Sequence, residues 1–171
     1  MRRSSILVAM VSLALSGCGY HAVHGGGETR PPLRVVLAHA DVADGECAEA
    51  TLLGVRDALS AQGLLAPGTG YPRIEVDVLR IDHAAHAIGS GIQPRATQLR
   101  VSVLGRARIT TGVGQVAEDT GDVRAGVGYA PQSGASEILA DADATRAAGR
   151  RLGKMLGERI LGIPTVSEDP P

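Results

Sequence analysis

The chain is almost free of aromatic side chains. Its 171 residues include no tryptophan, no phenylalanine and only three tyrosines. A hydrophobic core must therefore be built from leucine, valine, isoleucine and alanine. The shortage of aromatic rings also argues against a protein that binds single-stranded nucleic acid, because such proteins stack the bases on aromatic side chains.

The chain also lacks an excess of one charge and an apolar segment of membrane-spanning length. Seventeen basic residues stand against 18 acidic ones, so no overall positive field recruits nucleic acid. The apolar run near the N-terminus, Ile6–Leu15, covers about ten residues. A transmembrane helix needs roughly 20, so we expect no permanent membrane span.

The N-terminal run has the layout of a secretory signal. Arg2 and Arg3 precede it, and the small residues Ser16 and Gly17 follow it. A basic start, a short apolar segment and a small-residue cleavage site are the three parts of a signal peptide. We therefore expect residues 1–17 to be removed, which leaves 154 residues with 15 basic and 18 acidic side chains. That length fits one domain.

Cysteine is scarce, and the first of the two cysteines has a distinctive setting. Residues Leu15–Cys18, LSGC, resemble the bacterial lipobox. The resemblance implies that the Cys18 thiol carries a lipid and that acyl chains such as palmitate anchor the protein in a membrane. Gly19 is not the aspartate that retains lipoproteins at the inner membrane, so the resemblance implies the outer membrane. The alternative is an ordinary signal peptide with a chance cysteine near its end.

An acylated Cys18 would leave Cys47 without a partner for an internal disulfide. Cys47 could then be a free buried thiol or an intermolecular one. Its place on a predicted helix favours burial, and nothing near it suggests an activated nucleophile.

The rest of the chain divides into a tether, one domain and a tail. Residues 18–32 contain three successive glycines and two prolines, which favour a flexible tether. Residues 33–164 carry the periodic hydrophobic patterns of a folded domain. Residues 165–171 are polar and proline-rich, and we expect them to be disordered.

Hydrophobic periodicity predicts six elements in the domain. Residues 33–38 form a largely apolar run, predicted to be a strand covered on both sides. Residues 73–82, with a bulge near Val78, and residues 98–109 and 123–129 alternate as strands do. Residues 46–62 and 136–161 have helical spacing, and Pro164 is expected to end the second helix. These elements predict an α+β fold, one mixed sheet of about four strands with both helices on one face, in the order β-α-β-β-β-α.

The strand over residues 98–109 suggests a binding surface. Its odd positions are apolar, whereas its even positions include Arg100, Arg106 and Arg108. Because side chains alternate across a sheet, the three arginines should project from the face opposite the core. Guanidinium groups there could bind phosphates. The alternative is a solvated face balanced by Glu75 and Asp77 on the neighbouring strand.

The sequence contains no recognisable catalytic or cofactor site. Ser133 is outside the Gly-x-Ser-x-Gly motif, and Asp141 and Asp143 diverge on their helix. The pairs at Gly112/Gly114 and Gly126/Gly128 suggest turns and bulges rather than a nucleotide-binding loop. We expect neither an enzyme nor a cofactor.

Two histidine pairs raise the question of a metal. The pairs are His21 with His24, in the tether, and His83 with His86, in a predicted glycine-rich loop. Paired imidazoles can bind zinc or copper, but no third ligand is fixed by spacing. Solvated loop histidines are the expected interpretation.

Taken together, the residues C-G-Y-H at Cys18–His21 and the order of elements up to Pro164 resemble the lipopolysaccharide-assembly lipoproteins, the LptE-like family. The resemblance implies an outer-membrane lipoprotein that faces the periplasm or lies within the lumen of a β-barrel partner. It also implies binding of lipopolysaccharide and a role in its transport to the cell surface. The alternative is a periplasm-facing lipoprotein that scaffolds or regulates an envelope or cell-wall machine.

Overall fold

The structure is a computed structural model that describes residues 30–42, 44–87 and 96–164. All of these residues except Arg30 belong to one unit. Within the described ranges, neither helix has the length and hydrophobicity to span a bilayer. The predicted signal peptide, Cys18 and the tail at residues 165–171 lie outside the described residues.

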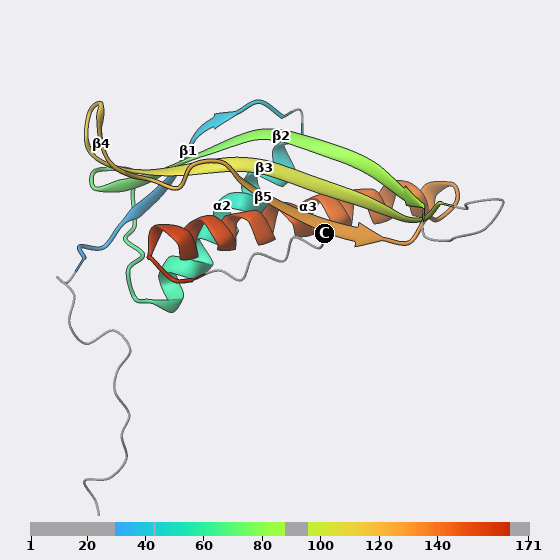
Figure 1. Cartoon of the computed structure of the whole chain (residues 1–171). Helices are drawn as coiled ribbons and strands as arrows, with labels where there is room; N and C mark the ends of the chain where they lie inside the picture. Colours follow the sequence, from blue (N-terminus) through green and yellow to red (C-terminus); the bar gives the residue numbers. More distant parts are fainter. Residues whose placement is uncertain (1–29, 43, 88–95, 165–171) are drawn as a thin grey trace, which may run out of the picture. The chain divides into compact units, whose positions relative to one another are not determined.

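The unit is built on a five-stranded mixed sheet (Figure 1). Four strands follow the order β1-β2-β3-β4, and β5 pairs with β3 on the same side as β4. Only the β1–β2 pairing is parallel. The strands are β1 (Arg34–Ala40), β2 (Arg73–Ala87), β3 (Ala96–Gly112), β4 (Gln115–Asp119) and β5 (Val123–Tyr129).

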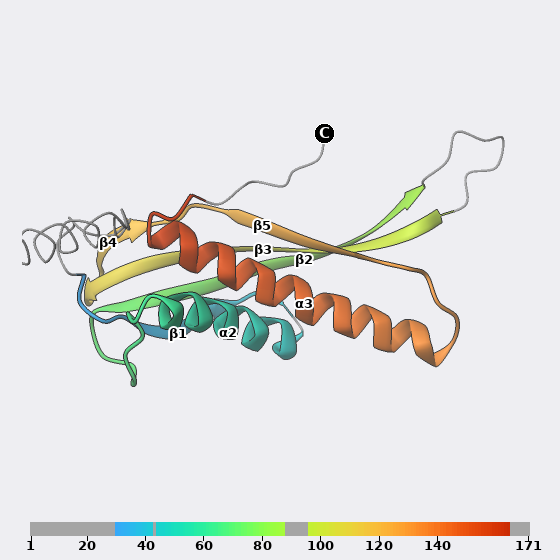
Figure 2. The same ribbon diagram turned by 90° about the horizontal axis from the view of Figure 1, so that it is seen from below.

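Both helices, α2 (Gly45–Ala61) and α3 (Ala135–Ile160), pack on the same face of the sheet (Figure 2). The Asp44 side chain caps α2 by accepting hydrogen bonds from the backbone N–H groups of Glu46 and Cys47. The predicted α+β class and the placement of the helices are confirmed. The second predicted helix, residues 136–161, agrees with α3 to within one residue at each end. The helix stops at Ile160, before Pro164, and Gly162 turns the chain with a φ of 70°.

The core lies between the sheet and the helices. Odd-numbered residues of β3, from Val101 to Ile109, point toward the helices and are buried. Leu152 of α3 is fully buried, and its Cδ2 would lie 2.9 Å from a Cβ placed on Gly105. A glycine at this point of β3 therefore lets the leucine side chain reach the sheet backbone.

The two helices touch along a line of glycines, which we call the glycine seam: Gly54 of α2 with Gly149, Gly153 and Gly157 of α3. A Cβ on Gly153 would overlap the carbonyl oxygen of Thr51, and one on Gly149 would lie 2.7 Å from the carbonyl oxygen of Cys47. No larger residue fits at these contacts without a shift of the backbone. The spacing of four residues keeps the three α3 glycines on one face of the helix.

Two strand predictions need correction, one strand was not predicted, and the predicted bulge is confirmed. β1 is not covered on both sides, since Val35 is its only buried residue. β2 continues through His83 and His86, which the sequence placed in a loop. β4 was not predicted, because all five of its residues are exposed and show no alternation. The predicted bulge is present, as a register shift between Val78 and Arg80.

Candidate anion-binding face of the sheet

One face of the sheet carries no described helix, and we call it the open face (Figure 1). Strand register decides which charged residues meet there. Arg108 lies opposite Glu75 of β2 and Asp119 of β4, and Arg106 lies opposite Asp77. Alternation thus places Arg106 and Arg108 on the open face, as predicted, together with carboxylates from both neighbouring strands.

Arg108 forms an ion pair with Asp77 in the middle of the sheet. Its Nη2 donates to Asp77 Oδ2 at 2.8 Å, and Asp77 is only 7% exposed. Asp77 Oδ1 and Arg108 Nε are buried and have no hydrogen-bond partner among the described protein groups. Loss of Arg108 would leave a buried carboxylate without its counter-charge, which is a strongly destabilising change.

Arg106 is also engaged by carboxylates. Its Nη2 lies 3.0 Å from Asp122 Oδ1, and its Nε lies 3.6 Å from Asp119 Oδ1. Glu75 pairs with Arg73, at 2.6 Å, rather than with a predicted binding residue. Arg106 and Arg108 are therefore balanced by carboxylates, as the alternative interpretation expected, but the Arg108–Asp77 pair is largely buried rather than solvated.

Arg100 has a different environment. No carboxylate among the described residues pairs with it, and its side chain lies flat across β5. Its Nε would be 2.7 Å from a Cβ on Gly126, and Gln98 approaches Gly128 in the same way. The suggestion that Gly126 and Gly128 form turns or bulges is wrong, because β5 pairs with β3 in regular register through both. The glycines instead make room for the side chains of β3.

Two arginines that the sequence analysis did not single out also lie on this face. Arg80 of β2 and Arg124 of β5 both contact Asp82, at 2.9 Å each. Leu104 lies between them, since it is the β3 partner of both. The alternation of β2 breaks at the bulge, so the sequence alone did not place Arg80 and Asp82 on the arginine-bearing face.

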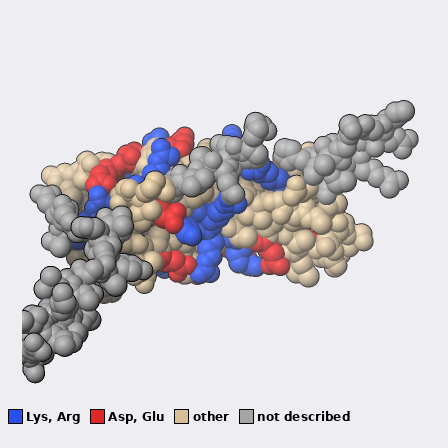
Figure 3. All heavy atoms as spheres, turned by 60° about the horizontal axis from the view of Figure 1, so that its bottom comes forward, with Lys and Arg blue, Asp and Glu red and all other residues tan. Residues whose placement is uncertain are grey.

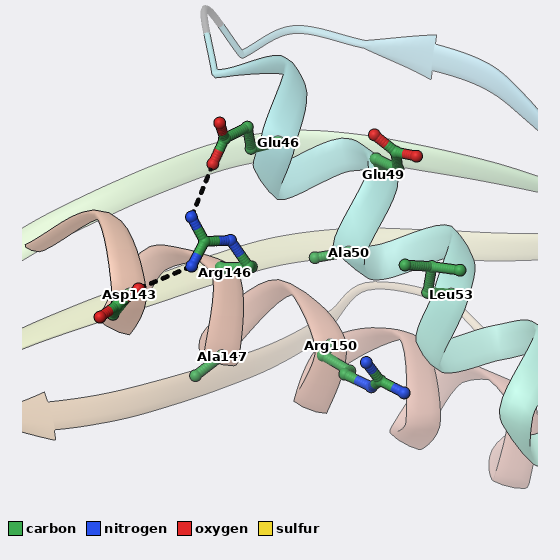
Figure 4. Close-up of a pocket in the computed structure, with 8 residues that line it drawn as sticks. All are labelled: Glu46, Glu49, Ala50, Leu53, Asp143, Arg146, Ala147 and Arg150. Atoms are coloured by element: carbon green, nitrogen blue, oxygen red, sulfur yellow. Dashed lines mark hydrogen bonds and ion pairs between the residues drawn. The ribbon is translucent and has the colours of Figure 1, made fainter. Parts of the chain in front are cut away.

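The opposite, helix-bearing side has basic side chains across its middle (Figure 3). Several of them are paired with acids. Arg146 contacts Glu46 at 2.9 Å and Asp143 at 2.6 Å, and Arg150 contacts Asp57 at 2.6 Å. Glu46, Asp143 and both arginines also line a groove of about 450 Å³ between α2 and α3 (Figure 4). Both arginines have acidic partners, and Glu49 also lines the groove. The groove is therefore a weaker anion site than the part of the open face at Arg100, which pairs with no carboxylate among the described residues.

The histidine at position 83 takes part in a small polar cluster. His83 Nδ1 lies 3.2 Å from Asp141 Oδ1, which also accepts a 2.7 Å hydrogen bond from the Tyr129 hydroxyl. This bond raises the pKa of Tyr129 to about 12. Asp143 pairs instead with Arg146, so the two aspartates do diverge. Within the described ranges, no group of three or more potential ligands is placed to hold a metal ion. His21 and His24 lie outside those ranges.

Cys47 is a buried free thiol, as its place on the helix predicted. Burial, together with the nearby charge of Asp44, raises its pKa to about 11. The thiol is therefore protonated at neutral pH and is a poor nucleophile.

Comparison with known proteins finds similar structures but no similar sequences. No protein-family model matches the chain, and no curated protein sequence matches it. Among solved structures, a minor lipoprotein from Acinetobacter baumannii aligns with a TM-score of 0.51 and 14% identity, over 77% of this chain and 94% of that one. The chain therefore shares its fold with this protein.

Two further solved structures align less closely. Rare lipoprotein B from Shewanella oneidensis has a TM-score of 0.41 at 7% identity, over 75% of this chain and 91% of that one. An uncharacterized lipoprotein B from Nitrosomonas europaea has a TM-score of 0.45 at 10% identity, over 81% of this chain and 94% of that one.

Proposed function

We propose that the protein is a lipid-anchored lipoprotein of the outer membrane that binds lipopolysaccharide and acts with a β-barrel partner in its transport to the cell surface. The observation that carries this proposal is the open face, an arginine-bearing sheet surface that no described helix covers. The role is one of binding and assembly rather than of catalysis.

The chemistry of the open face suits a phosphorylated lipid. Lipopolysaccharide carries phosphates, and guanidinium groups bind phosphates through paired, charge-assisted hydrogen bonds. The charged exterior also suits the polar lumen of a large barrel. The lipobox-like LSGC and the name of the Acinetobacter protein, a minor lipoprotein, support the anchor.

The anchor can be tested by a single substitution. Cys18→Ala should abolish incorporation of labelled fatty acid and leave an unprocessed or soluble protein, because no neighbouring residue can form the thioether. The matched control is Cys47→Ala, which removes the other cysteine and should leave labelling and membrane flotation unchanged. Labelled, membrane-bound Cys18→Ala protein would disprove the anchor.

The partner is tested by purification of the full-length chain from detergent-solubilised envelopes. We expect a large outer-membrane β-barrel and lipopolysaccharide to co-purify with it. Recovery of a soluble or cell-wall partner, without barrel or lipopolysaccharide, would contradict the proposal and favour the alternative of an envelope scaffold or regulator.

A further inference from the structure

We infer that the phosphate-binding part of the open face is the cluster formed by Arg80, Arg100 and Arg124 around Asp82, which we call the distal cluster. The inference rests on the proposed function because it assumes a lipid ligand. It adds which residues bind the phosphate of that lipid. Its ligand is a phosphate group, with an amphiphile such as lipid A as the expected source. Arg106 and Arg108 are then structural.

Charge is distributed unevenly along the open face. At the end near β4, arginines and carboxylates are equal in number: Arg34, Arg73, Arg106 and Arg108 with Glu75, Asp77, Asp119 and Asp122. The distal cluster has three arginines and a single aspartate, which contacts Arg80 and Arg124 but not Arg100. Two positive charges therefore remain uncompensated among the described residues of the cluster.

Register brings the three arginines together. Arg80, Leu104 and Arg124 occupy one row across β2, β3 and β5, and Asp82 and Gly126 belong to the next row. The β3 residue of the second row is Ser102, and Arg100 lies two positions before it in β3. The side chain of Arg100 extends toward the second row and lies over Gly126. The absence of a side chain at Gly126 is what lets the Arg100 guanidinium approach the row of Asp82.

The guanidinium groups of the cluster keep donors available. Arg80 uses Nε and Arg124 uses Nη1 to contact Asp82, and each guanidinium has five N–H donors in total. The side chains of Arg80 and Arg124 are 57% and 47% exposed, whereas those of Arg106 and Arg108 are 40% and 32% exposed. None of the cluster's arginines has a buried, unpartnered nitrogen, which Arg106 and Arg108 both have. The open donors thus belong to the distal cluster.

Leu104 favours an amphiphile over a free phosphate ion. It is an apolar, partly exposed residue with an arginine on either side. A ligand that places a phosphate on the guanidinium groups and carbon atoms beside them can cover Leu104 as well. Inorganic phosphate gains only the charged contacts.

The test uses residues 18–171 with Cys18→Ala, so that acyl chains do not tether the protein to lipid. The distal variant carries Arg80→Gln, Arg100→Gln and Arg124→Gln. The control carries Arg56→Gln, Arg150→Gln and Arg159→Gln, which remove the same charge from the helices. Flotation measures binding to phosphatidylcholine vesicles with lipid A, with lipid A lacking both phosphates, or with phosphatidic acid. Calorimetry measures the binding of inorganic phosphate, and circular dichroism checks that each variant is folded.

We expect the distal variant to lose affinity for lipid A vesicles by about tenfold or more, and the control by about twofold or less. Lysines at the three distal positions should restore part of the loss, because they keep the charge without the planar fork. Removal of the phosphates from lipid A should weaken wild-type binding as strongly as the distal variant does.

Other outcomes separate the inference from the proposed function. Wild-type affinity for lipid A in a folded distal variant, or an equal loss in the control, would overturn the distal cluster and leave lipopolysaccharide binding standing. Binding only to phosphatidic acid or inorganic phosphate, with loss in the distal variant, would support the cluster and contradict the proposed function. Absence of binding to every phosphate probe would overturn both.

Discussion

Leu152 is the residue whose side chain ties α3 most directly to the sheet. It is fully buried and contacts the sheet at Gly105. Leu152→Ala should lower the free energy of unfolding by about 2 to 5 kcal/mol, because it removes buried methyl groups and leaves a cavity. The control Arg150→Ala removes an exposed ion pair with Asp57 and should cost less than about 1 kcal/mol. Urea unfolding measures both, and equal effects would show that the orientation of α3 is wrong.

Cys47 makes the stability of the protein sensitive to alkaline pH. Its pKa is raised from 9.0 to about 11 in the folded state. A group that stays protonated in the fold contributes its full stability below the unfolded pKa, and loses it as pH rises through the folded pKa. The free energy of unfolding should therefore fall between pH 9 and pH 11, and less steeply for Cys47→Ala. The Tyr129 hydroxyl, whose pKa is raised to about 12, titrates in both proteins. Parallel pH profiles would contradict this assignment.

At the scale of elements, the glycine seam sets the distance between α2 and α3. Gly153→Ala should lower the free energy of unfolding by about 2 to 3 kcal/mol, because its methyl group would overlap the Thr51 carbonyl. Gly45→Ala, at the start of α2, meets nothing within 4 Å and should change stability by less than about 1 kcal/mol. Thermal unfolding followed by circular dichroism distinguishes them. A Gly153→Ala protein as stable as wild type would refute the close contact.

The elements that the sequence predicted correctly are those with strong hydrophobic patterns. α2, α3 and the central part of β3 each bury a regular set of residues, so periodicity identified them. β4 and the end of β2 have exposed residues, and periodicity gives no signal where nothing is buried. The glycine seam was missed because glycine weakens a helix locally, and only contact with a second helix explains its presence.

In the candidate site, the sequence pattern predicted which side chains share a face but not which of them pair. Alternation along β3 was enough to predict that Arg100, Arg106 and Arg108 share a face with one another. It could not predict their partners, because pairing depends on the register between strands. Asp77 was expected to balance this face and does pair with Arg108. The pairing of Asp82 with Arg124 joins residues 42 positions apart, and no local pattern indicates it.

At the scale of the whole molecule, the sheet depends on α3 for its cover. A chain that ends at Ala130 would expose Val101, Val103 and the rest of the helix-facing side of β3 to water. We expect this truncated chain to show no cooperative urea transition, since it loses most of the burial that offsets chain entropy. The control ends at Pro164, retains every described element and should unfold as the full chain does. A cooperative transition without α3 would show that the sheet is stable alone.

The glycine seam also has a consequence for the time course of folding. It joins the earliest helix of the domain to the last, and the ion pair beside it links residues 100 positions apart. Contacts between distant segments form slowly, because a long loop must close before they contribute. Three glycines in the C-terminal half of α3 give that helix little stability of its own before α2 is in place. We therefore expect folding to begin only after the C-terminal helix has been synthesised, and the newly made chain to remain unfolded until then.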